Sequence, residues 1–129
     1  AGQVPVFSSV TLDGSPVDLT DAQRAVALDY ADNWYVRHVA LDSNRTSTWS
    51  SGIGGALMVE AIAHPNNEPF PASVVMQGEY GIHGVSSSSP VILGAQGLVK
   101  VVEIPLDSEE TSRMHEAAAK IGELAATLH

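Results

Sequence analysis

A short connection bounded by two glycines constrains the fold of this chain more than any other feature. Gly94–Gly97 (Gly-Ala-Gln-Gly) separates the apolar run Ser87–Leu93 from a second apolar run, Leu98–Pro105. A connection this short joins antiparallel neighbours, since parallel strands need a crossover of a dozen or more residues. A further apolar run, Ala72–Gln77, comes earlier in the chain. The sequence therefore predicts three strands in an antiparallel sheet.

Helical periodicity marks two segments that precede these strands. Asp18–Asp21 provides candidate N-cap residues, and apolar residues at helical spacing predict one long helix that ends at about Leu41. A second periodic segment begins within Ser47–Ser50 and ends at His64, where Pro65 interrupts the pattern. Two helices are expected between the N-terminal region and the sheet.

Two other segments carry strand and loop signals. Val4–Leu12 is rich in β-branched residues and is followed by Asp13-Gly14, a strong signal for a tight turn. A strand and a turn are expected there. Asn66–Pro71 contains two prolines and paired asparagines, a composition that predicts a loop.

The chain closes with a third predicted helix. Asp107 stands at a candidate N-cap position with Glu110 three residues later, and apolar residues from Met114 to Leu128 follow at helical spacing. Together with the antiparallel strands, the helices predict an α+β fold with long helices packed on one side of the sheet. A length of 129 residues with 44% hydrophobic content predicts a single domain over residues 1–129.

Charge and cysteine content narrow the functional classes. Fifteen acidic residues against six basic ones give a net charge of −9, which disfavours binding to nucleic acid and to anionic membranes. No apolar run is long enough to span a bilayer. The chain contains no cysteine, which excludes thiolate chemistry and fits a reducing compartment, so a cytoplasmic location is expected.

The titratable residues form no recognisable catalytic or metal-binding motif. The histidines are His38, His64, His83, His115 and His129, and no pair of them has the spacing of a zinc motif. A Gly-x-Ser-x-Gly elbow, typical of serine hydrolases, does not occur. We therefore predict neither a metal site nor a catalytic residue within these 129 residues.

Four short motifs follow one another along the chain. Val4–Ser8 reads Val-Pro-Val-Phe-Ser, Gly14–Pro16 reads Gly-Ser-Pro, Met58–Ile62 reads Met-Val-Glu-Ala-Ile, and Gly78–Ile82 reads Gly-Glu-Tyr-Gly-Ile. In this order they resemble the C-terminal half of the NAD-dependent lactate/malate dehydrogenase family. The resemblance covers nearly the whole chain and implies the family's substrate-side domain.

Two positions depart from the family pattern. Phe7 stands where the family usually has tryptophan, and His83-Gly84 stands where an acidic pair usually follows the Gly-Glu-Tyr-Gly-Ile motif. The second departure weakens any salt bridge that the family makes at that turn. Neither change affects a residue that the resemblance marks as catalytic.

The resemblance implies that the chain begins just after the family's catalytic histidine. The Gly-x-Gly-x-x-Gly nucleotide turn, the mobile-loop arginine, and the Asp and Arg that orient the histidine and bind the substrate carboxylate would all lie upstream. The chain would then be the C-terminal domain of an oxidoreductase that transfers a hydride between NAD and malate or lactate. NAD would be bound mainly by an N-terminal nucleotide-binding domain that this chain lacks, so the isolated chain is expected to be inactive.

One position in the chain resembles a substrate-binding residue of the family. Counting back from Met58–Ile62 places Ser47 at the hydroxyl that begins the second helix near the substrate, with Thr46 and Thr48 as alternatives in a shifted register. A hydroxyl and free backbone N–H groups at a helix start suit a carboxylate or carbonyl oxygen. The alternative is that Ser47 only caps the helix.

The second predicted helix also carries Gly52, Gly54 and Gly55, which favour either close packing against another backbone or flexibility at the start of the helix. In the family this helix lies at a subunit interface beside the active site, which implies a homo-oligomer and contact with the chain's own nucleotide-binding domain. A surface left uncovered would promote self-association. The alternative function is a non-catalytic, free-standing association or ligand-binding module.

Overall fold

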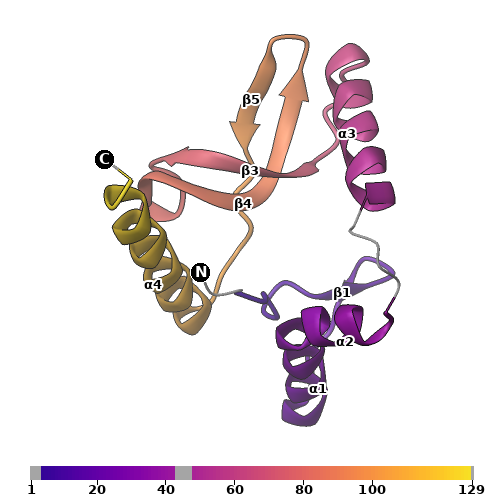
Figure 1. Ribbon diagram of the computed structural model, residues 1–129, viewed down its shortest axis with the longest axis vertical. Coiled ribbons are helices and arrows are strands. Elements are labelled where there is room, and N and C mark those ends of the chain that lie inside the picture. Colours follow the sequence, from indigo (N-terminus) through magenta and orange to yellow (C-terminus); the bar gives the residue numbers. More distant parts are fainter. Residues whose placement is uncertain (1–3, 43–47, 129) are drawn as a thin grey trace. The chain divides into compact units, whose positions relative to one another are not determined.

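The computed structural model describes residues 4–42 and 48–128, apart from the side chain of Thr48 (Figure 1). The chain divides into two compact units, one made of Ala1–Ser43 with Ile104–His129 and the other of Asn44–Glu103. In chain order the elements are β1 (Thr11–Leu12), β2 (Ser15–Pro16), α1 (Asp21–Asp32), α2 (Trp34–Ala40), α3 (Thr48–Ala63), β3 (Phe70–Gln77), the 3₁₀ helix η1 (Glu79–Gly81), β4 (His83–Gly94), β5 (Gly97–Val101) and α4 (Ser108–Ala126).

The second unit is built on the predicted antiparallel sheet. Its strand order is β3-β4-β5, and both pairs are antiparallel, which confirms the prediction. The tight connection is confirmed as well, since Gly94 pairs with Gly97 across it. Gly97 has a φ of 99°, a conformation that favours glycine over any residue with a side chain. Helix α3 begins at Thr48, as the periodicity predicts, and lies in contact with β4.

The core of this unit lies on β4 and its neighbours. Met76 of β3 and Val91 of β4 are fully buried, and Ile82, Ile92 and Leu93 are almost so. The exposure along β3 alternates between exposed and half-buried residues, which is the period-two pattern of a strand with one covered face. Apolar burial around β4 holds the three strands together.

Pro90 of the neighbouring strand β4 sets the end of β5. The apolar run predicts a strand up to Pro105, but the ladder ends at Val101. The next residue, Val102, donates its N–H to the carbonyl of Pro90 at 2.7 Å, and Pro90 has no N–H to donate in return. The Val102 carbonyl accepts instead from the hydroxyls of Ser89 at 3.2 Å and Tyr80 at 3.4 Å. Side chains therefore replace the missing ladder bond.

A proline also lies inside β3, in a segment whose composition predicts a loop. Phe70 and Pro71 belong to β3 and pair with Val91 and Pro90. The loop prediction for Asn66–Pro71 is therefore wrong at its last two residues. The physical reason is that β3 is an edge strand, and the carbonyl of Pro90 points to the β5 side of β4, so the Pro71–Pro90 pair needs no N–H from either proline.

The Gly-Glu-Tyr-Gly-Ile motif forms the turn between β3 and β4. Tyr80 has a φ of 53° and Gly78 a φ of 136°, both in the left-handed range. The N–H of Tyr80 donates to the Glu103 carboxylate at 2.6 Å. A Cβ on Gly78 would lie 3.3 Å from the His83 ring, so glycine also allows the imidazole to pack there. The predicted structural role of this motif is consistent with these contacts.

In the first unit, the N-terminal region is a hairpin rather than a long strand. From residue 4 to residue 42, the paired residues are Thr11–Leu12 and Ser15–Pro16, around a turn in which Asp13 and Gly14 have φ values of 50° and 79°. The turn prediction is confirmed. The strand predicted from Val4 is wrong before Thr11. The N–H groups of Phe7 and Ser8 are directed to a side chain, described below, and that of Val10 to the Phe7 carbonyl, so none of the three donates to a ladder.

The single long helix predicted up to Leu41 is wrong, because the structure has α1 and α2 in its place. Asn33 separates them with φ −100° and ψ 13°. Its side-chain amide donates to the Asp29 carboxylate at 2.8 Å. This bond joins two side chains, and the Asn33 N–H still donates to the Asp29 carbonyl at 3.1 Å. The break therefore comes from the non-helical backbone of Asn33, a residue with low helix propensity.

Helix α4 follows the predicted capping box. The Asp107 carboxylate accepts from the Glu110 N–H at 2.8 Å, and the Glu110 carboxylate accepts from the Asp107 N–H at 3.0 Å. Four helices and antiparallel sheets confirm the α+β class. The expectation of a single domain stays a prediction.

Candidate functional site

The three residues predicted to bind substrate are Thr46, Ser47 and Thr48, and the described part of α3 begins at the last of them. Ser47 and Thr46 are outside the residues that the structure describes, and Thr48 is the first residue of α3. The first turn of this helix contains no acidic residue. Its positive dipole end therefore suits an anion such as a carboxylate. The assignment of Ser47, Thr46 or Thr48 to substrate stays a prediction.

The helix that starts there has an exposed apolar stripe. Trp49, Ile53 and Leu57 recur every four residues and are 77%, 60% and 55% exposed. Gly54 stands beside them, and a Cβ built on it meets nothing within 4 Å. An exposed stripe of this kind is typical of a surface that packs against another protein surface.

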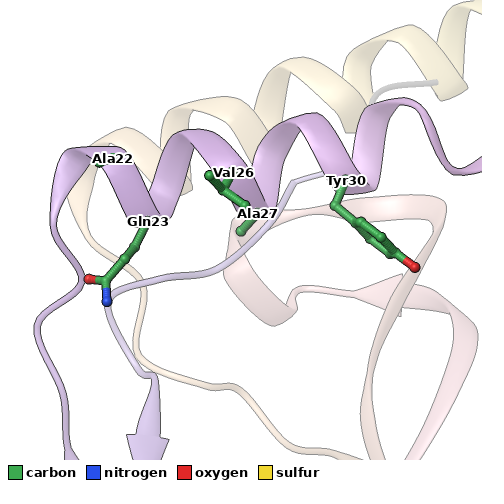
Figure 2. Close-up of a pocket in the computed structure, with 5 residues that line it drawn as sticks. All are labelled: Ala22, Gln23, Val26, Ala27 and Tyr30. Carbon is green, nitrogen blue, oxygen red and sulfur yellow. The ribbon is translucent and has the colours of Figure 1, made fainter.

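A second exposed apolar surface lies on α1 (Figure 2). Val26 and Tyr30 are 71% and 67% exposed. The one amide side chain on this face, Gln23, already accepts hydrogen bonds from the Thr20 N–H at 2.8 Å and hydroxyl at 3.0 Å. This face therefore suits an apolar partner surface better than a small polar substrate. Its lining residues are Ala22, Gln23, Val26, Ala27 and Tyr30.

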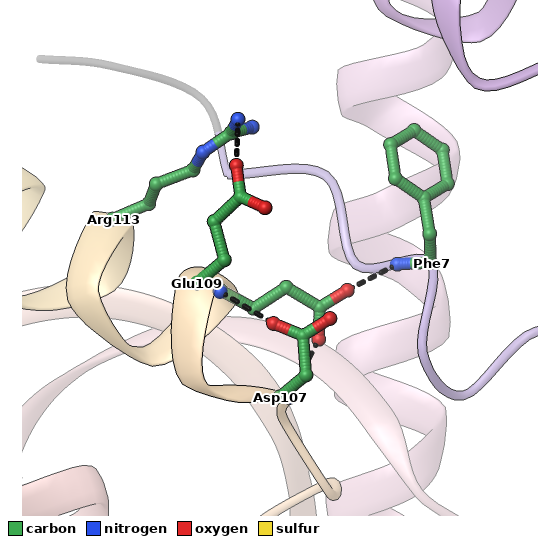
Figure 3. Close-up of polar contacts among 5 residues, drawn as sticks. Phe7, Asp107, Glu109 and Arg113 are labelled. Carbon is green, nitrogen blue, oxygen red and sulfur yellow. Dashed lines mark hydrogen bonds and ion pairs between the residues drawn. The ribbon is translucent and has the colours of Figure 1, made fainter. Parts of the chain in front are cut away.

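The most constrained polar group in the first unit is Glu110, which is 5% exposed. Its Oε1 accepts from the backbone N–H groups of Phe7 at 2.6 Å and Ser8 at 2.9 Å. Its Oε2 accepts from the Ser8 hydroxyl at 2.5 Å and from the Asp107 N–H at 3.0 Å. Figure 3 shows Phe7 on the N-terminal segment facing the helix start at Asp107. We call these four residues the Glu110 clasp.

The clasp keeps Glu110 ionised. Burial raises the pKa of its carboxyl group, but the hydrogen bonds from the Ser8 hydroxyl and from the N–H groups of Asp107, Ser8 and Phe7 outweigh burial and lower the pKa to about 2. An ionised carboxylate is an acceptor only, so four donors suit it.

The ring of Phe7 is held from another direction. The Arg24 guanidinium of α1 lies over the ring, 5.7 Å from its centroid, and the Arg24 Nε donates to the Leu19 carbonyl at 3.2 Å. The segment that resembles the chain following the family's catalytic histidine is thus fixed at its backbone by α4 and at its ring by α1.

The described residues show no cation site. The clearest histidine–carboxylate pair, His64 Nδ1 and Glu60 Oε1 at 3.0 Å, is an exposed contact near the end of α3. Over residues 4–42 and 48–128, no three histidine or acidic side chains lie close enough together to hold a metal ion. In the same part of the chain, no helix is both long and apolar enough to cross a membrane.

Comparisons with known proteins agree with this architecture. The family model for the lactate/malate dehydrogenase α/β C-terminal domain matches residues 1–127. The chain belongs to the lactate/malate dehydrogenase family. It is 35% identical over 120 residues to the malate dehydrogenase of Haloferax volcanii, a match that covers 92% of this chain and 38% of that relative. The chain therefore spans about two fifths of the length of the curated relatives it matches.

Solved structures of the lactate/malate dehydrogenase family share the fold. The malate dehydrogenase from Salinibacter ruber matches with a TM-score of 0.84 and 28% identity, over 97% of this chain and 41% of that one. The minor L-lactate dehydrogenase from Enterococcus mundtii also has a TM-score of 0.84, over 98% and 42% of the two chains, but at 20% identity it supports the fold alone. The resemblance inferred from the sequence motifs is confirmed.

Sequence reasoning missed the second role of Glu110. The capping-box spacing from Asp107 predicts one of its four contacts, and the structure confirms that contact. The bonds to Phe7 and Ser8 join residues more than 100 positions apart, and no local pattern signals them. The contact of Glu110 with Phe7 and Ser8 can therefore be recognised only in the folded structure.

The low pKa of Glu110 predicts a loss of stability in acid. Its folded value of about 2 lies below the ordinary 4.5, so between these values the unfolded chain binds a proton that the folded chain does not. The stabilisation is present above pH 4.5 and is lost as the pH falls toward 2. Urea titrations from about pH 6 to about pH 3 should show a steeper loss of unfolding free energy in the wild type than in Glu110→Gln.

The matched control for this experiment is Glu109→Gln. Glu109 is the neighbouring residue on α4, and its side chain is 72% exposed and paired with Arg113 at 2.5 Å. This variant should keep the pH slope of the wild type, because exposed ion pairs contribute little. Equal slopes for wild type and Glu110→Gln would contradict the role assigned to the clasp.

Proposed function

We propose that this chain is the substrate-side domain of an NAD-dependent 2-hydroxy acid dehydrogenase, which transfers a hydride between NAD and a small 2-hydroxy acid. The observation that carries this proposal is the match of the family C-terminal domain to residues 1–127. The relatives at 35 to 41% identity are malate dehydrogenases, which favours malate over lactate as the substrate. The proposed location is cytoplasmic.

The residues of this chain do not fit NAD on their own. Both sheets that the structure describes are antiparallel, whereas dinucleotide sites are built on parallel strand–helix–strand units. The sequence has no Gly-x-Gly-x-x-Gly turn either. The proposed parent protein therefore binds the cofactor mainly through a separate nucleotide-binding domain, and the isolated chain is inactive.

The contribution of this chain to the substrate pocket is proposed at the start of α3. The helix begins at Thr48, its first turn lacks a competing acidic residue, and Ser47 immediately precedes it in the sequence. A hydroxyl with free helix N–H groups is chemically suited to the carboxylate or carbonyl oxygen of a 2-oxo acid. The Ser47 hydroxyl is the preferred group, with Thr46 and Thr48 as alternatives.

The apolar stripe on α3 supports the proposed protein partners. Trp49, Ile53 and Leu57 present large apolar side chains to solvent along one line of the helix. In an assembled dehydrogenase we propose that a second subunit or the protein's own nucleotide-binding domain covers this stripe. Burial of such side chains contributes on the order of 1.5 to 3 kcal/mol each, enough to favour association.

A free-standing, non-catalytic association or ligand-binding module is the alternative function. The apolar, open face of α1 favours it, because a surface of this kind binds a partner without any catalytic group. The two functions differ in whether the natural protein turns over a 2-oxo acid.

The first measurement is the intact mass of the natural protein, followed by NADH oxidation assays with oxaloacetate and pyruvate. We expect a protein of roughly 300 residues, in line with domain sizes for two-domain enzymes, that turns over oxaloacetate faster than pyruvate. The isolated chain should turn over neither acid. A natural protein with only these residues, inert to both acids, would favour the binding module.

The proposed substrate contact predicts a selective loss in the parent enzyme. Ser47→Ala should lower kcat/KM for the 2-oxo acid roughly tenfold, because one lost hydrogen bond costs on the order of 1.4 kcal/mol. The KM for NADH should stay unchanged. Steady-state kinetics of Thr46→Ala and Thr48→Ala check the register, and Ser51→Ala, further along the helix, serves as a control. Loss confined to Thr46→Ala or Thr48→Ala would move the contact to that residue.

The apolar stripe predicts self-association of the isolated chain. Ile53→Lys places a charge in the stripe and should lower the apparent mass in light scattering, because burial of an unpaired charge is unfavourable. Val99→Lys is the control, since Val99 is a similarly exposed residue, at 64%, on β5 of the same unit. That variant should associate like the wild type. A monodisperse wild-type monomer would argue against an association surface on α3.

A further inference from the structure

We propose that Glu110 is a positioning residue of the dehydrogenase. Through the Glu110 clasp it fixes the backbone of Phe7 and Ser8, and with it the chain segment that leads into them. This inference rests on the proposed function and on the family resemblance, which implies a catalytic histidine shortly before Val4 in the parent protein.

The two carboxylate oxygens of Glu110 accept hydrogen bonds from two segments that are distant in sequence. A capping box needs one carboxylate oxygen for the N-cap N–H, and Oε2 of Glu110 meets that need with Asp107 at 3.0 Å. The other oxygen, Oε1, serves only the N–H groups of Phe7 and Ser8. The Ser8 hydroxyl adds a third contact from the N-terminal segment. Three of the four bonds therefore act on the segment and not on the helix.

The segment has no regular secondary structure to hold it in place. The residues that the structure describes before Thr11 belong to no strand or helix. Helix α4, in contrast, is 19 residues long and is capped at its start. Glu110 thus anchors an irregular backbone to a rigid helix, and the two bonds at 2.6 and 2.9 Å fix the orientation of two successive peptide groups.

The charge on Glu110 makes the arrangement specific for a carboxylate. An amide has one acceptor oxygen and an NH₂ group that only donates. In Glu110→Gln, that NH₂ group would face two of the four donors of the clasp, and the backbone would have to move away from it. In catalysis, a distant mutation that misplaces the reacting groups by about 1 Å can lower the rate roughly 100-fold.

The experiment uses the full-length parent enzyme and compares Glu110→Gln with Glu109→Gln. We expect Glu110→Gln to lower kcat for the 2-oxo acid roughly tenfold or more and to leave the KM for NADH unchanged. The pH profile of kcat/KM should also shift, because the histidine that carries the proton changes its surroundings. Glu109→Gln should match the wild type in all three readouts.

A second variant keeps the test decisive if Glu110→Gln does not fold. Ser8→Ala removes only the hydroxyl donor of the clasp, and Ser9→Ala is the adjacent control. We expect Ser8→Ala to lower kcat severalfold relative to Ser9→Ala and to shift the pH profile in the same direction as Glu110→Gln.

The outcomes separate this inference from the proposed function. A wild-type parent that turns over a 2-oxo acid, with unchanged kcat and pH profile in Glu110→Gln and Ser8→Ala, would overturn the positioning role and leave the function intact. If the variants lost thermal stability but kept the kcat and pH profile of the wild type, the positioning role would likewise be overturned and the proposed function left intact. A wild-type parent with no activity toward either acid would overturn the function and the inference together.

Discussion

The carboxylate of Glu110 accepts four hydrogen bonds where the N-terminal segment meets the start of α4. Without these bonds, the N–H groups of Phe7 and Ser8 would need other partners, since no ladder runs along that segment. The same residue caps α4. One ionised group thus links the two chain segments of the first unit, which residues 44–103 separate in the sequence. The chain depends on this contact because hydrogen bonds to a buried charge are strong and costly to lose.

The sheet of the second unit is limited by a different constraint, the missing N–H of Pro90. The ladder between β4 and β5 ends beside this residue, and the hydroxyls of Ser89 and Tyr80 bind the Val102 carbonyl instead. Tyr80 can reach that carbonyl from a left-handed backbone conformation in the turn after β3. A proline, a strained tyrosine and a buried serine therefore form one structural arrangement, and the Gly-Glu-Tyr-Gly-Ile motif is part of it.

Both units expose large apolar side chains on their helices. Val26 and Tyr30 do so on α1, and Trp49, Ile53 and Leu57 do so on α3. A surface of this kind is typical of a domain that functions within a larger assembly. This agrees with the comparison of lengths, since the chain spans about two fifths of the length of the relatives it matches. The proposed dehydrogenase, with its nucleotide-binding domain and further subunits, would supply the missing contacts.

Local patterns predicted most of the fold correctly, because each depends on a few neighbouring residues. The Gly94–Gly97 turn, the start of α3 and the Asp107 capping box are of this type. The errors arose where one residue, or a strand's place in the sheet, outweighed the pattern of the surrounding segment. Asn33, whose backbone is non-helical, separates α1 from α2, and Pro71 belongs to β3 because that strand lies at an edge.

The same division applies to function. The sequence by itself determined the α+β class and the family motifs, since short motifs and spacing carry that information. The substrate position that the resemblance implies at Ser47, with Thr46 and Thr48 as alternatives, stays a prediction. Only the tertiary structure decided that Glu110 binds Phe7 and Ser8 and that the α3 stripe is exposed. The physical reason is that hydrogen bonding and burial between distant segments depend on how the whole backbone folds, and no local sequence pattern contains that geometry.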